Sequence, residues 1–268
     1  MNALLKTLII LELKAHSGKM LEINSILILK IHFVIAMIWT KYSPGLISVN
    51  TGTGSSKTYL LQFQLDSLDF FPDIKERIKV VDTPAIIKAK TVHAVTYPAI
   101  SYRGRVASWA VNFLKDNLKP KEEAEHKKIY ISRNDAVARN VTNEPAVIDM
   151  LVTEFGFTPI NTHKTNSMSG MTLEEKLGLF AAADVVVSPT GAGLTHTHAM
   201  KAGSTVIDFN HSFEVAEECG WNNIADVCDL NWHTLEAETG VIPEERPKPK
   251  NAHMKIDISR LREALNNI

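Results

Sequence analysis

The chain has 268 residues, of which 29 are Lys or Arg and 30 are Asp or Glu, so the formal net charge is −1. This near-neutral charge excludes a strongly basic nucleic-acid binder and a protein with an acidic tail. Apolar residues make up 45 % and charged residues 22 %, which excludes a disordered chain and predicts one large or two small globular domains. Two cysteines, Cys219 and Cys228, are too few for a disulfide framework, so we expect two free thiols or a single bridge.

The first long apolar run, SILILKIHFVIAMIW, covers residues 25–39 and contains Lys30 and His32. A transmembrane helix needs roughly 20 mostly apolar residues, so this run is short, and it carries a cation. Glu12, Lys14 and the lack of a small-residue cleavage site disfavour a signal peptide. We therefore expect a buried strand or helix here, with a weak membrane anchor as the alternative.

The rest of the first half contains apolar segments whose order does not define a fold. The polar stretch Lys119–Lys128 predicts a linker, which divides the chain into an N-terminal lobe over 1–118 and a C-terminal lobe over 127–268. In the N-terminal lobe we expect a helix over 59–71, strands over 78–82 and 91–97, and a helix over 105–118 that buries Val106, Trp109, Ala110 and Phe113.

The second half predicts alternating strands and helices. Glu144–Phe155 has helical spacing and ends before Gly156, while Thr172 and Glu175 form a capping box that starts another helix. We expect strands over 128–132, 157–161, 184–188 and 205–209, with a glycine turn and a short helix between the last two. This order is typical of an open parallel sheet of the Rossmann type, whose ligands bind at the carboxyl ends of the strands.

The stretch VVVSPTGAGLTHTHAM, residues 185–200, contains the glycine turn Gly191-Ala192-Gly193, where a buried strand should pass into a helix. Small residues at such a turn let backbone N–H groups approach an anion, and the helix adds the positive end of its dipole. A tight turn without a ligand is the alternative interpretation.

Two arginines, Arg133 and Arg139, follow the strand at 128–132 and should lie on the same edge of the sheet as the glycine turn. Guanidinium groups match phosphate oxygens, so the pair suits a diphosphate clamp, with surface salt bridges as the alternative. Asp208 ends a later strand, where a carboxylate can accept hydrogen bonds from ribose hydroxyls or cap a helix.

The second half resembles glycosyltransferase family 61 in three consecutive blocks: KIYISRNDAVARNVTNEPAVIDML, LEEKLGLFAAADVVVSPTGAGLTHTHAM and GSTVIDF. The resemblance covers about residues 127–210 and is faint in the first half. It implies an α/β protein with a GT-B-like architecture. Residues 127–268 would form the Rossmann-like lobe that binds a nucleotide sugar, and residues 1–118 a smaller or incomplete α/β lobe on the acceptor side.

The resemblance also implies an inverting hexosyl- or pentosyltransferase that moves a sugar from a nucleotide sugar, expected to be UDP-linked, to a glycan or protein. No tightly bound metal and no cofactor are expected. The candidates for the general base are His196, Asp135 and Glu144, and His196 is preferred because a neutral imidazole suits proton transfer near pH 7. The expected substrate-binding residues are Ser132, Arg133, Arg139, Gly191, Ala192, Gly193, Leu194, Thr195 and Asp208.

Two departures from the family pattern bear on activity. Thr190 stands where members usually carry His, and no His-Trp pair occurs in the first half. A non-catalytic nucleotide- or glycan-binding protein is therefore the alternative function. We expect no nucleic-acid partner and leave membrane association open. The expected location is the cytoplasm if the protein is bacterial and the lumen of the ER or Golgi if it is eukaryotic.

Other patterns point to no additional site. GTGSSKT at 52–58 lacks two glycines of a phosphate-binding loop. No Gly-x-Ser-x-Gly elbow of a serine hydrolase occurs, and the glycine turn differs from the G-x-G-x-x-G of a dehydrogenase. The following residues lack zinc-site spacing, so we expect no metal site: His196, His198, His211, Cys219, Cys228 and His233.

Overall fold

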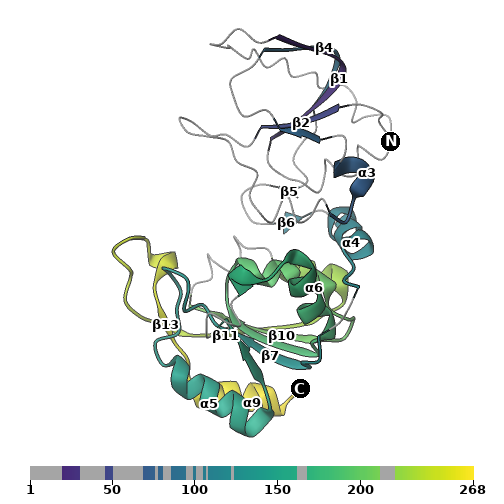
Figure 1. Ribbon diagram of the computed structural model, residues 1–268. Helices are drawn as coiled ribbons and strands as arrows, with labels where there is room; N and C mark the ends of the chain where they lie inside the picture. Colours follow the sequence, from purple (N-terminus) through teal and green to yellow (C-terminus); the bar gives the residue numbers. More distant parts are fainter. Residues whose placement is uncertain are drawn as a thin grey trace. The chain divides into compact units, whose positions relative to one another are not determined.

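The computed structural model describes residues 20–30, 46–50, 69–75, 78–80, 86–94, 99–100, 105–106, 108–121, 124–161, 168–211 and 221–268 (Figure 1). The chain divides into two compact units, Met1–Pro98 and Ala99–Ile268. This division lies earlier than the expected linker at 119–128. Described residues of that linker bond to the second unit, because the N–H groups of Lys121 and Ala124 donate to Glu174 and Gly178.

In the first unit, four strands form a parallel sheet in the order β3-β2-β1-β4. The elements are β1 (Met20–Lys30), β2 (Leu46–Asn50), α3 (Pro72–Lys75), β3 (Ile78–Val80) and β4 (Ile86–Ala94). Strand β1 contains the start of the apolar run at 25–39, which confirms a strand as far as Lys30. Residues 31–39 and the GTGSSKT stretch lie outside the described residues. Within the described ranges, no helix is long and apolar enough to cross a membrane.

The other expected elements of the first unit are confirmed in part. Strand β3 confirms the strand expected over 78–82. Strand β4 begins earlier than the 91–97 that we expected, because its pairing with β1 starts at Met20 and Ile86. Of the helix expected over 59–71, only residues 69–71 are described, and they lie in and next to a turn before α3.

The second unit begins with an antiparallel pair, β5 (Ala99–Ile100) and β6 (Arg105–Val106), followed by α4 (Ser108–Asn117). The buried face expected for this helix is partly wrong. Val106 lies in β6, and Trp109 is 49 % exposed. The helix instead buries Ala110 and Val111, because Val111 packs against Ile224 and Cys228 of a later helix. Cys228 is a buried free thiol, so the single bridge considered above is not formed.

The centre of the second unit is a five-stranded sheet in the order β11-β10-β9-β7-β8, with every pair parallel. This confirms the predicted open parallel sheet. The strands are β7 (Lys128–Ile131), β8 (Thr158–Ile160), β9 (Val185–Pro189), β10 (Thr205–Asn210) and β11 (Asn231–Glu236). The helices are α5 (Glu144–Phe155), α6 (Leu173–Ala182), α8 (Trp221–Cys228) and α9 (Ile258–Asn266). Short elements are the 3₁₀ helices η2 (Met168–Gly170), η3 (Ala192–Ala199) and η4 (Pro249–Asn251), and the strands β12 (Glu238–Thr239) and β13 (Met254–Lys255).

The sheet has a hydrophobic core on each face, since successive side chains of a strand point to opposite sides. On one face, Val187 and Phe209 pack with Leu151 of α5 and Leu261 of α9. On the other, Val186 and Val206 pack with Phe180 of α6 and Leu194 of η3. Figure 1 shows α5 and α9 side by side on one face and α6 on the opposite face. The sheet is therefore covered on both sides, which leaves its strand ends as the accessible polar region.

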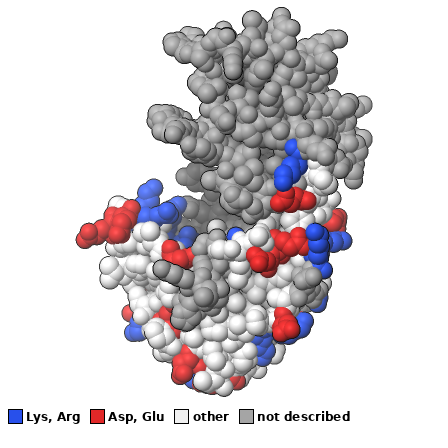
Figure 2. All heavy atoms as spheres, viewed as in Figure 1, with Lys and Arg blue, Asp and Glu red and all other residues white. Residues whose placement is uncertain are grey.

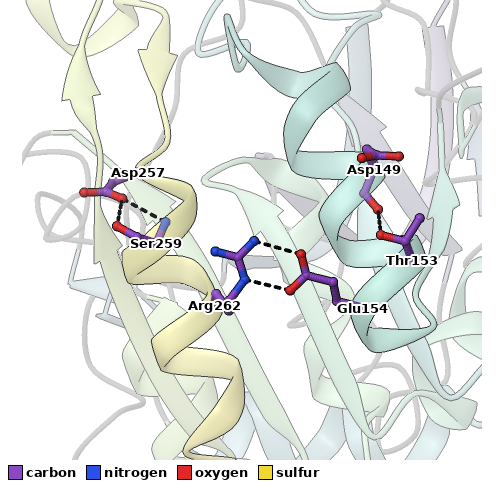
Figure 3. A network of polar contacts seen from close by, with 6 residues as sticks. All are labelled: Asp149, Thr153, Glu154, Asp257, Ser259 and Arg262. Carbon is purple, nitrogen blue, oxygen red and sulfur yellow. Dashed lines mark hydrogen bonds and ion pairs between the residues drawn. The ribbon is translucent and has the colours of Figure 1, made fainter.

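Local signals define the C-terminal end of α5 and the N-terminal end of α6, as predicted. Gly156 has φ 70, and its N–H donates to the carbonyl groups of the last turn of α5. The Thr172 hydroxyl accepts the N–H of Glu175, and the Glu175 carboxylate accepts the N–H of Thr172, which completes the capping box of α6. Figure 3 shows the contact that joins α9 to α5, in which the Arg262 guanidinium donates to both oxygens of Glu154 at 2.6 and 2.7 Å.

Candidate functional site

The strand order creates a topological switch point between β7 and β9. From β7 the chain moves outward to β8 on one side, and β9, β10 and β11 then follow outward on the other side. Ligands of parallel α/β sheets bind outside the carboxyl ends of the strands at such a point. Arg133 comes shortly after β7, and Gly191 shortly after β9. Because β7 pairs directly with β9, the two predicted motifs leave the sheet next to each other.

Buried polar side chains gather along this edge. Ser132, Asn161, Thr190, Asp208 and Asn210 are each at most 8 % exposed. The Asn161 amide donates to the Ser132 carbonyl at 2.9 Å and to the Asp135 carboxylate at 2.8 Å. Burying polar groups is unfavourable unless they find partners, so this concentration at the strand ends distinguishes the edge from the apolar faces of the sheet.

The guanidinium of Arg133 lies directly against Gly191. A Cβ atom at position 191 would lie 1.9 Å from a terminal nitrogen of Arg133 and 2.9 Å from its Cζ. The Arg133 Nε and its other terminal nitrogen face the Ala138 carbonyl at 3.4 and 3.3 Å. Gly191 has φ −179, which any residue can adopt, so glycine is required here for close approach and not for backbone freedom. The prediction that the two motifs lie on one edge of the sheet is confirmed, whereas their role in binding stays a prediction.

The backbone of the glycine turn leads into η3, and its residues differ in what they can offer a ligand. The Leu194 side chain is fully buried, and its N–H donates to the Gly191 carbonyl at 3.1 Å. The Thr195 carbonyl accepts the Nδ1 of His198 at 2.7 Å. The amides of Ala192 and Gly193 come first in the helix, where N–H groups have no intrahelical acceptor. These two amides are the ones best placed to meet an anion beside Arg133.

Arg139 has φ 61, a left-handed conformation that residues with long side chains rarely adopt. Its Nε is buried and has no hydrogen-bond partner within the described residues. The Arg139 charge lowers the pKa of Asp208 and that of His211. Arg139, in the loop after β7, and Asp208, near the end of β10, thus both lie towards the carboxyl edge of the sheet.

Burial raises the pKa of Asp208 to about 8, although the Thr190 hydroxyl and the Arg139 charge both lower it. Asp208 is 2 % exposed, and its Oδ1 has no hydrogen-bond partner in the described part of the chain. The Thr190 hydroxyl influences the carboxyl without reaching hydrogen-bond geometry. Asp208 is therefore largely protonated near pH 7 and retains an oxygen that can accept a hydroxyl of a ligand.

The three candidate bases lie in different surroundings. The His196 ring packs against Phe180, with ring centroids 5.6 Å apart, and burial, followed by the charges of His198 and Lys176, lowers its pKa to about 3. The buried Glu144 carboxylate accepts the Tyr130 hydroxyl at 2.7 Å, and burial together with Glu144 raises the pKa of Tyr130 well above its usual value. Asp135 is exposed at the edge beside Asn161. This geometry favours Asp135 over His196 and Glu144 for contact with a substrate.

His211 is a residue at this edge that the sequence analysis considered only as a metal ligand. It follows β10 directly, and its Nε2 is buried without a hydrogen-bond partner among the described residues. Burial lowers its pKa, the Arg139 charge lowers it further, and backbone contacts with His211 itself and Ala252 oppose this. The position directly after the strand that carries Asp208 was the signal that could have identified it.

An open pocket of about 530 Å³ lies at the carboxyl end of β11, next to the end of β10. Its lining mixes both charges, in the residues Glu236, Glu238, Lys255, Asp257 and Arg260, with Ala237 and Ile256 between them. The surface shows the same mixture, since Figure 2 shows positive and negative side chains interspersed over the described part of the visible face. In the described ranges, no group of three or more His, Cys, Asp or Glu could hold a metal ion.

The sequence profile described as glycosyltransferase 61 matches residues 30–207, more than half of the chain. The chain belongs to glycosyltransferase family 61. Membership supports glycosyl transfer as its activity, with a nucleotide-sugar donor and a glycan or protein acceptor. A search of curated proteins found no match for this chain. The family match ends before Asp208 and His211, so the geometry at the strand ends is the argument for including these two residues in the site of this glycosyltransferase.

Proposed function

We propose that the protein is an inverting glycosyltransferase that uses a UDP-linked sugar without a metal ion and transfers the sugar to a hydroxyl of a glycan or protein. We further propose that its two units form a GT-B-type enzyme, with the parallel sheet of the second unit as the donor side. The contact between the Arg133 guanidinium and Gly191 at the switch point carries this proposal. It combines a cation, a close backbone approach and a helix start, which together suit a diphosphate.

In the proposed reaction, the acceptor hydroxyl attacks the anomeric carbon and a base takes its proton. A new carbon–oxygen bond forms while the bond to the diphosphate breaks, and the bonding electron pair leaves with the diphosphate. The negative charge that develops there meets Arg133, Arg139 and the amides of Ala192 and Gly193, so that preorganised donors replace a metal ion. Asp135 is the base that the geometry favours.

The nucleoside would extend along the strand ends from β9 towards β11. Asp208 has a carboxyl oxygen that no described residue bonds and that a ribose hydroxyl could contact, and the pocket beside β11 has room for further polar groups. Glu236 lines that pocket. It is the last residue of β11 and pairs in register with Asn210, the last residue of β10, so the pocket lies at the ends of these two strands.

A panel of nucleotide sugars tests the proposed function. The expected result is release of nucleoside diphosphate with one donor in the presence of an acceptor, and inversion at the anomeric carbon of the product. Binding of a nucleotide sugar without release would favour the alternative of a non-catalytic binding protein. The panel also separates hexosyl from pentosyl donors.

Removal of metal ions is expected to leave donor binding and turnover unchanged, because the described residues at the strand ends supply arginines and amides rather than a carboxylate cluster. The measurement compares the Kd for nucleotide sugar and the rate of diphosphate release with and without a chelator. A large loss of affinity after chelation, restored by a divalent cation, would show that a cation meets the diphosphate charge.

The substitution Gly191→Ala is expected to lower turnover by about tenfold or more, since a displaced cation is costly for catalysis. The new Cβ would occupy the place of the Arg133 terminal nitrogen, so the guanidinium must move away. Because only the end of a flexible side chain is displaced, the melting temperature should change little. Gly170→Ala is the matched control, since a Cβ at position 170 meets no atom within 4 Å. Equal turnover of both variants would mean that this contact is unimportant.

A further inference from the structure

Residues 251–256, which lie beyond the end of the family match, run along the loop that carries Arg139. The hydrogen bonds between residues 139–143 and residues 251–256 are called the tail clamp here. The tail clamp contains three backbone bonds, Arg139–Asn251 (3.3 Å), Asn140–Met254 (2.9 Å) and Thr142–Met254 (2.8 Å). It also contains four bonds that involve a side chain: one from the Thr142 hydroxyl to the Met254 carbonyl (3.2 Å), two between the Asn143 amide and the Ile256 backbone (2.8 and 2.9 Å), and one between Asn140 and His253 (3.2 Å).

One side chain of the segment, His253, adds a bond at the residue next to Arg139. Its Nδ1 accepts the backbone N–H of Asn140 at 3.2 Å. The backbone of His253 is itself held by the two residues that follow β12: its N–H donates to the Val241 carbonyl at 2.8 Å, and its carbonyl accepts the Gly240 N–H at 2.7 Å. These two bonds hold the backbone of His253, so its side chain has a defined position from which Nδ1 can accept the Asn140 N–H.

Arg139 needs such support because its backbone conformation is unfavourable. A non-glycine residue at φ 61 is strained and persists only where the surroundings enforce it. Asn161 and Asp229 also have positive φ, but Asn and Asp tolerate this conformation far better than Arg. The tail clamp holds the N–H groups of Arg139 and Asn140, which flank the Arg139 Cα, and this enforces the conformation.

We propose that His253 is a positioning residue for the glycosyl transfer: by holding the Asn140 amide, it keeps Arg139 in the left-handed conformation that it has at the edge of the sheet. The proposal rests on the proposed function. It also means that the C-terminal segment completes the donor site, although the family match does not reach it.

A double-mutant cycle tests this role through kcat and KM for the donor in the full-length chain. His253→Ala is expected to lower kcat about tenfold with little change in KM, because a misplaced guanidinium acts mainly on the charge that develops in the transition state. In an Arg139→Ala background, the same change should lower kcat by less than about twofold, since residues that act through one another are not additive. His253→Asn, whose amide oxygen can accept the Asn140 N–H, should restore most of the loss. The exposed His233 on β11 gives the matched control, His233→Ala, with wild-type kinetics.

Two results would overturn the proposal. One is an unchanged kcat in His253→Ala. The other is a double variant whose kcat falls by the product of the two single-variant losses, as it would if His253 had a merely structural role. Should His253→Ala melt below the assay temperature, His253→Phe keeps the ring volume, removes the acceptor and completes the cycle. A wild-type chain that releases no nucleoside diphosphate from any donor would remove the proposed function itself, and this result is distinct from an active chain with multiplying losses.

Discussion

Arg133→Ala is expected to lower turnover by about 10²–10³, because removing one preorganised donor to developing charge costs about 3–4 kcal/mol of transition-state stabilisation. The guanidinium lies against Gly191 at the switch point, where the diphosphate would leave. Arg133→Lys should recover only part of the loss, since an ammonium keeps the charge but not the planar fork. The measurement is nucleoside diphosphate released per second by each variant, together with its melting curve.

Arg262→Ala is the matched control for this experiment. Arg262 pairs with Glu154 on the surface between α9 and α5, so its removal should change turnover little while loosening that contact (Figure 3). If turnover of Arg133→Ala equals that of wild type, Arg133 belongs to the surface and the reaction lacks its main cation. A surface role for Arg133 would appear only as a small change in stability.

Asp208→Asn is expected to stabilise the protein at high pH and to weaken donor binding. Burial raises the pKa of Asp208 from 3.8 to about 8 in the folded chain, so between these values the folded state holds a proton that the unfolded state has lost. The free energy of unfolding of the wild type therefore falls as pH rises from about 4 to about 8, by up to about 5 kcal/mol from this group. An asparagine does not titrate, so the variant escapes this loss.

Denaturant unfolding of both chains at pH 4 and at pH 9 measures this difference. The stabilities should be similar at pH 4, and the variant should be the more stable at pH 9. The Kd for nucleoside diphosphate should rise about tenfold in the variant at pH 9, as expected when a hydrogen bond to a charged group is lost. Equal pH dependence in both chains would contradict the burial argument, and unchanged affinity would remove Asp208 from the ribose site.

The elements of the second unit could be predicted because their signals are local. The helix at 144–155 shows periodic apolar residues and a terminal glycine, and the capping box at Thr172 involves residues only three apart. Such signals depend on backbone geometry within one turn, so no distant contact can easily override them. The helix expected over 105–118 was less accurate, because its buried face depends on Ile224 and Cys228, which lie far away in the sequence.

The candidate site was predictable only in its outline. The expectation that Arg133 and the glycine turn share one edge follows from the alternation of strands and helices. That they touch depends on β7 pairing with β9, a long-range pairing that no local pattern encodes. The preference for His196 came from the suitability of a neutral imidazole for proton transfer near pH 7, but the ring packs against Phe180, and burial lowers its pKa to about 3.

By itself, the amino-acid sequence determined the α/β class, the parallel sheet of the second unit and the family, because strand–helix alternation and consecutive motif blocks are properties of the chain read in order. Only the tertiary structure decided which polar groups gather at the strand ends. Strand order sets which loops become neighbours, and burial sets which side chains keep their charge. The tertiary structure brought His253 to the loop that carries Arg139 and buried Asp208. Neither could be predicted, because contacts between distant segments arise from packing and not from spacing along the chain.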